Sequence, residues 1–130
     1  MLLGIAVLGL VACDGDRGGA GTPTPTGSVS GGSAARALAA LCEMTVATGP
    51  EPAGATFYDR AHVGLHAIAA AVGEVDREAE GTLLVTMQRV EADLDRPELP
   101  VGFADDVGAL RVATVAALEL IELPAPACSA

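Results

Sequence analysis

The chain has 130 residues and a formal net charge of −10, with 17 acidic and only 7 basic side chains. Phosphate backbones and anionic headgroups repel so acidic a body, which argues against nucleic-acid binding and against electrostatic attachment to a membrane. The sequence has two Phe, one Tyr and no Trp. A core of Ala, Val and Leu without alternating β-branched or aromatic runs favours packed helices over sheets.

The first residues form a short apolar segment that ends in a cysteine. The run from Leu2 to Leu10 carries no charge. It matches the apolar region of a signal peptide and falls well short of the roughly 20 residues that span a bilayer. The tetrapeptide LVAC at positions 10–13 resembles the lipobox of bacterial lipoproteins, although the basic residue that usually opens a signal peptide is missing. The resemblance implies a cleaved signal peptide over residues 1–12, a diacylglyceryl group on Cys13 and a lipid anchor on the extracytoplasmic face of the cell membrane.

A tether is predicted after the cysteine. Residues 14–33 are rich in Gly, Ser, Thr, Pro and Asp and contain one large aliphatic residue, Val29. Such a segment buries too little apolar surface to offset the entropy lost on ordering. We therefore expect a lipidated cysteine and a disordered tether over 13–33, followed by one small domain over 34–130.

The other two cysteines are predicted to pair with each other. Once Cys13 is assigned to the lipid, Cys42 and Cys128 remain, and export to an oxidising compartment favours their oxidation. The bond would tie the first helix of the domain to its C-terminus. The alternative is two free thiols.

Apolar residues at helical spacing predict four helices. The expected helices run from Ser33, as N-cap, to about Thr48; from about Thr56 to about Gly73; from Asp76 to about Asp95; and from Phe103 to about Leu123. Proline-containing segments at 49–52 and 96–100 are interpreted as breaks. The short connections favour antiparallel neighbours, so the expected fold is an all-α, up-down four-helix bundle.

The candidate metal site lies on the second and third helices. His62 and His66 are the only histidines, and residues four apart share one face of a helix. Asp59, one turn earlier, falls on the same flank. On the third helix, Glu91 lies within the apolar stripe, where a carboxylate needs a cation. His62, His66, Glu91 and Asp59 are therefore candidate ligands for copper, zinc or iron.

The sequence leaves other partners for this carboxylate open. Glu91 can instead pair with Arg60, with Arg111 or with a protonated His62, while the histidines hold no ligand. A zinc-protease mechanism is not expected, because Val63 occupies the position next to His62 where such enzymes carry their general-base Glu. No spacing signature of an activated nucleophile appears either, so we expect no enzymatic activity.

A second resemblance covers residues 57–94. The stretches FYDRAH-x-x-x-H and MQRVEADL are similar to small, alanine-rich, cysteine-containing lipoproteins of actinobacteria, a resemblance that implies helices but no particular activity. Two functions are consistent with the sequence. One is a lipid-anchored domain that binds a transition metal. The other is a structural or protein-interaction lipoprotein with an envelope protein as its partner.

Overall fold

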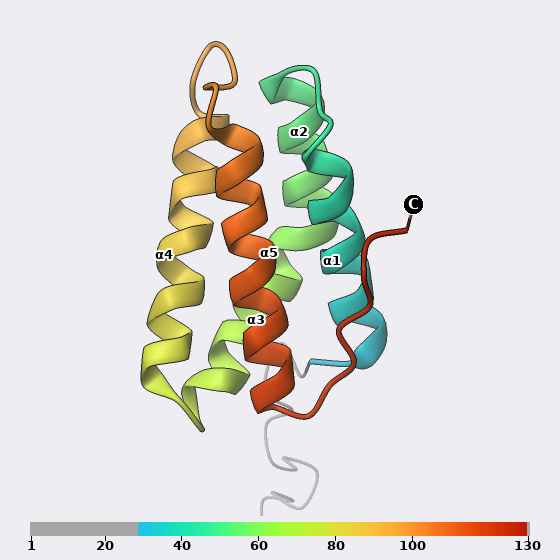
Figure 1. The fold of residues 1–130 in the computed structure, drawn as a ribbon, viewed down its shortest axis with the longest axis vertical. Helices are drawn as coiled ribbons and strands as arrows, with labels where there is room; N and C mark the ends of the chain where they lie inside the picture. Colours follow the sequence, from blue (N-terminus) through green and yellow to red (C-terminus); the bar gives the residue numbers. More distant parts are fainter. Residues whose placement is uncertain (1–28, 130) are drawn as a thin grey trace, which may run out of the picture.

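In the computed structural model of the chain, residues 29–129 are described, and these form only helices and connections (Figure 1). The predicted signal peptide, Cys13 and most of the predicted tether lie outside the described residues. The elements are, in chain order, α1 (Gly31–Met44), α2 (Pro50–Thr56), the π-helical segment η1 (Phe57–Ala61), α3 (His62–Gly73), α4 (Arg77–Leu94) and α5 (Phe103–Leu120). Because α2, η1 and α3 follow one another without interruption, these elements make four helical segments. The all-α prediction is confirmed.

Helix α1 begins earlier than the sequence suggested. Ser30, not Ser33, is the N-cap, and the two serines form a capping box. The Ser33 amide donates to Ser30 Oγ at 3.1 Å, and the Ser30 amide donates to Ser33 Oγ at 3.1 Å. Two amide groups that a helix start leaves unpaired are thereby satisfied. The tether predicted to reach residue 33 thus ends at least three residues earlier, since Gly31 is already helical.

The segment 49–52, predicted as a break, separates α1 from α2 but also starts the new helix. Gly49 is the N-cap of α2, and Pro50 is its first residue. Proline suits the first turn of a helix because its missing N–H would have no partner there and its φ is already helical. The second helical segment therefore begins at Pro50 rather than near Thr56.

The third and fourth predicted helices are close to the observed ones. Asp76 is the N-cap of α4, and its carboxylate accepts from the amides of Glu78 and Ala79 at 2.9 and 3.0 Å. Helix α5 begins at Phe103 as predicted. It ends at Leu120 rather than Leu123, because the chain turns at Glu122, the one non-glycine residue with a positive φ (58°) among residues 29–129.

One core runs between the helical segments. Helix α4 packs against α5 and α3, and α1 packs against η1, α5 and α3. The largest fully buried side chains include Phe57, Leu38, Leu41, Met44, Leu65, Ile68, Leu83, Met87, Leu110 and Leu118. The short connection at 74–76 turns the chain from α3 directly into α4, so that these two helices lie side by side (Figure 1). This pair of helices carries the candidate site.

Candidate metal centre

The two histidines follow the π-helical segment. The His62 amide donates to the Phe57 carbonyl, five residues earlier, which is the bond that defines a π turn. His62 then opens α3, and His66 lies one regular turn later. Single π turns inserted in helices are rare and often occur at functional sites. Here the π turn comes directly before the first candidate ligand.

Three of the four predicted ligands meet between α3 and α4. His62 Nε2 lies 2.9 Å from Glu91 Oε1, and His66 Nε2 lies 3.2 Å from His62 Nε2. One ligand atom from each of His62, His66 and Glu91 lies within 4.8 Å of the other two. It is the one such group among the described residues. Helices α3 and α4 thus bring the three side chains to one point, as the sequence predicted for His62, His66 and Glu91.

The choice of histidine tautomer shows why this point suits a cation. In the tautomer that carries hydrogen on Nε2, His62 donates to the Glu91 carboxylate, and the same hydrogen faces the lone pair of His66 Nε2. Two nitrogens and one oxygen then converge on a single proton. A metal ion would take the place of that proton, with His62 in the tautomer that carries its hydrogen on Nδ1, and would use one lone pair from each of the three ligand atoms.

Aromatic rings cover one side of His62. The Phe57 ring is fully buried, and its centre lies 5.5 Å from that of the His62 ring. The Tyr58 ring, which is partly exposed, meets His62 edge-on at 5.3 Å. Burial, together with the charges of Glu91 and Asp95, raises the pKa of the Tyr58 phenol above its ordinary value. The imidazole orientation of His62 is thus fixed by packing as well as by its hydrogen bond.

Asp59 does not join the group, contrary to the sequence prediction. It is exposed and lines a surface groove of about 580 Å³ between α1 and the η1–α3 segment, together with Tyr58, Arg60 and Val63. The prediction placed Asp59 beside His62 by regular α-helical geometry. The wider π turn between them changes that angle, and Asp59 is carried away from the ligand flank.

The structure also selects among the predicted partners of Glu91. Arg60 forms an ion pair with Glu43 on α1 instead, so the Arg60 alternative is wrong. Within residues 29–129, Glu91 makes a hydrogen bond with His62, which is an ion pair only when the imidazole is protonated, and no ion pair with Arg111. The Glu91 side chain is 29% exposed, the same fraction as His62. The carboxylate therefore lies at the border of the core rather than inside it.

A more deeply buried carboxyl group was missed. Asp93 is 7% exposed, and its Oδ2 atom has no hydrogen-bond partner among the described residues. Burial, followed by the neighbouring Asp106 carboxyl group, raises the pKa of Asp93, while Arg96 lowers it. The sequence held one signal for this burial: Asp93 lies three residues after Val90, which places it at the border of the apolar stripe of the helix.

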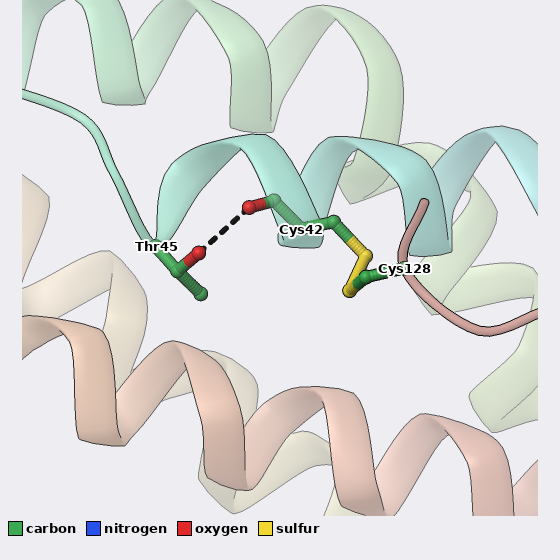
Figure 2. The surroundings of a disulfide bond; sticks show 3 residues. All are labelled: Cys42, Thr45 and Cys128. Carbon is green, nitrogen blue, oxygen red and sulfur yellow. Dashed lines mark hydrogen bonds between the residues drawn. A yellow bond between two sulfur atoms is a disulfide. The ribbon is translucent and has the colours of Figure 1, made fainter. Parts of the chain in front are cut away.

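The structure joins Cys42 to Cys128 by a disulfide (Figure 2). The Cα atoms lie 5.6 Å apart, within the range that a disulfide spans without backbone movement. After α5 the C-terminal segment runs back along α1 to reach this bond (Figure 1). The Thr45 hydroxyl donates to the Cys42 carbonyl at 2.7 Å, which caps α1 just beyond the cross-link.

The donor set narrows the metals that fit. Two imidazole nitrogens and one carboxylate oxygen suit zinc, copper(II) and iron(II), and three protein ligands leave coordination positions for water or another molecule. Calcium and magnesium prefer all-oxygen sites. Comparison with family models, with curated proteins and with solved structures finds no match to this chain. The proposal below therefore rests on the residues and their geometry.

Proposed function

We propose that this protein is a lipid-anchored, extracytoplasmic lipoprotein whose helical domain, an up-down bundle, binds a transition metal through His62, His66 and Glu91. The observation that carries the metal assignment is the convergence of three ligand atoms from α3 and α4 within 4.8 Å. Zinc, copper and iron(II) are the metals to test.

The anchor is argued from the sequence. The LVAC tetrapeptide at 10–13 resembles a lipobox, and two acyl chains suffice for stable membrane attachment. The disulfide between Cys42 and Cys128 fits an oxidising compartment. Among the helices of residues 29–129, none combines the length and apolarity needed to cross a membrane.

Metal binding is tested by calorimetric titration of the metal-free protein with Zn²⁺, Cu²⁺ and Fe²⁺. We expect one equivalent of at least one metal to bind more tightly than about 10 µM, which corresponds to about 7 kcal/mol. His62→Ala and Glu91→Gln should each weaken binding at least about tenfold, because a site with three ligands loses one.

Asp59→Asn is the matched control, since it removes a nearby carboxylate that lies outside the group. Its affinity should equal that of the unchanged protein. Loss of binding in this variant, or full retention in the His62 variant, would contradict the assignment. The anchor is checked by mass spectrometry of the mature protein, which should begin at Cys13 and carry the mass of a diacylglyceryl group.

A second candidate function is supported by the surface groove between α1 and η1–α3. Its lining places Arg36 beside Tyr58 and Val63, together with Asp59 and with Arg60, which pairs with Glu43. Val63 is 75% exposed. Arg36 beside apolar side chains on an otherwise acidic body suits an acidic segment of an envelope protein. Arg36→Glu should abolish cross-linking to such a partner while leaving metal binding unchanged.

A further inference from the structure

We propose that the metal centre is a transfer site, which passes its ion to an acceptor chelate through a mixed complex formed on the His66 side. This inference rests on the proposed function and adds a role for the bound metal. The geometry that carries it is the unequal enclosure of the three ligands.

The three ligands differ in how far solvent reaches them. His62 and Glu91 are each 71% covered, and His62 also has the Phe57 and Tyr58 rings against it. His66 is exposed, and the one aromatic ring pair it forms among residues 29–129 is with His62, at a centre distance of 4.6 Å. An incoming ligand therefore has one open approach, beside His66.

The metal would be held by few supporting contacts. Structural zinc sites have four protein ligands and are closed, whereas residues 29–129 supply three here. Metal-binding histidines usually donate their second ring N–H to a protein group, and loss of that partner costs about 10- to 100-fold in affinity. Among the described residues, the hydrogen bonds of both histidines involve Nε2 alone. Such a site holds its ion without a rigid outer shell.

The transfer step follows from this arrangement. A nitrogen or oxygen donor of the acceptor binds the metal at its open position, and the bond to His66 Nε2 breaks first. Further acceptor donors then replace His62 and Glu91. His62 takes up a proton from solvent at Nε2 and releases the one on Nδ1, so the imidazole stays neutral and its Nε2 hydrogen again bridges to the Glu91 carboxylate. The metal keeps its oxidation state, so no oxidant or reductant is required.

The kinetics of metal removal test this mechanism. The full-length protein, with its disulfide intact, is loaded with Zn²⁺ and mixed with an excess of the coloured chelator 4-(2-pyridylazo)resorcinol. We expect the observed rate constant to rise in proportion to the chelator concentration, because the chelator takes part in the step that breaks the bond to His66. A rate that does not depend on chelator concentration would overturn the inference, since the metal would then leave before the acceptor binds.

A shielding variant locates the approach. Ala70 is exposed and lies one turn after His66 on the same face of α3. A longer side chain there leans back toward the helix N-terminus, over His66. Ala70→Phe should slow transfer about tenfold, equivalent to about 1.4 kcal/mol in the barrier, with unchanged zinc affinity at equilibrium.

Ala104→Phe, at an exposed position in the first turn of α5, is the matched control and should transfer zinc at the original rate. Equal rates in the two variants would overturn the assigned approach. Failure of the unchanged protein to take up zinc, copper or iron is a different result, because it refutes the proposed function itself. The two failures are therefore distinguishable.

Discussion

The disulfide allows a quantitative prediction about stability. Cys42 and Cys128 are separated by 86 residues. In the chain-entropy model, closing a loop of this length lowers the entropy of the unfolded chain enough to stabilise the fold by about 4.6 kcal/mol at 25 °C. Replacing both cysteines by serine removes that constraint. The double variant Cys42→Ser, Cys128→Ser is therefore expected to unfold much more easily.

The folded state offsets part of this loss. Ile121, Leu123 and Ala125 pack against the core, so the chain up to that point stays in place without the bond. Beyond it, residues 126–129 are exposed and gain some backbone entropy when Cys128 is released, which reduces the net loss. We therefore expect a net loss of about 3 to 4 kcal/mol, near the upper part of the usual range for disulfides.

Urea unfolding followed by far-ultraviolet circular dichroism measures this difference. The disulfide-containing protein and the double variant should both carry Cys13→Ser. This substitution prevents Cys13 from forming a wrong disulfide, and the two proteins then differ only at positions 42 and 128. With an m-value of about 2 kcal/mol/M, the midpoint should fall by about 1.5 to 2 M urea. A loss below about 1 kcal/mol would show that the unfolded chain is not appreciably constrained, and the loop-closure reasoning would be wrong for this protein.

Two further substitutions are expected to stabilise the fold. Burial, and then the neighbouring Asp106 carboxyl group, raises the pKa of Asp93. Its contribution to stability is therefore complete below the unfolded pKa and is lost as pH rises through the higher folded value. Asp93→Asn should therefore raise the free energy of unfolding at neutral pH and remove this loss between acid and neutral pH, as urea titrations at several pH values would reveal. Glu122 adopts a φ of 58° after α5, a conformation that glycine adopts without a Cβ penalty. Glu122→Gly should therefore raise the free energy of unfolding by about 1 kcal/mol, and with it the thermal midpoint. An unchanged or lower midpoint in calorimetry would contradict that account.

The helices could be predicted where local signals agreed. Asp76 is a good capping residue before a long amphipathic segment, and α4 begins next to it as expected. The segment at 49–52 was harder, because proline both ends one helix and suits the first turn of the next. Its interpretation as a break was half right, since α1 ends before it and α2 begins inside it at Pro50.

The pairing of His62 with Glu91 was predictable because a short connection joins their helices. Helical spacing gives the direction of a side chain around its own helix, and a tight turn forces the next helix to lie alongside. The sequence could not predict that Asp93 is more deeply buried than Glu91. Both residues border the stripe of Met87, Val90 and Leu94, and only the packing of α5 against α4 decides which carboxylate is covered.

The π turn explains why Asp59 was wrongly included, and the sequence contained a signal for it. Five buried residues follow one another at intervals of four: Ala53, Phe57, Ala61, Leu65 and Ala69. In a regular α-helix each such interval rotates the side chain by about 40°, so the first and last would point about 160° apart and could not share one core. A wider turn within the run reduces this drift, and the structure places it at Phe57–Ala61. A series of buried positions spaced by four therefore predicts a π turn, and this one keeps the apolar side chains in the core and His62 on the side facing Glu91.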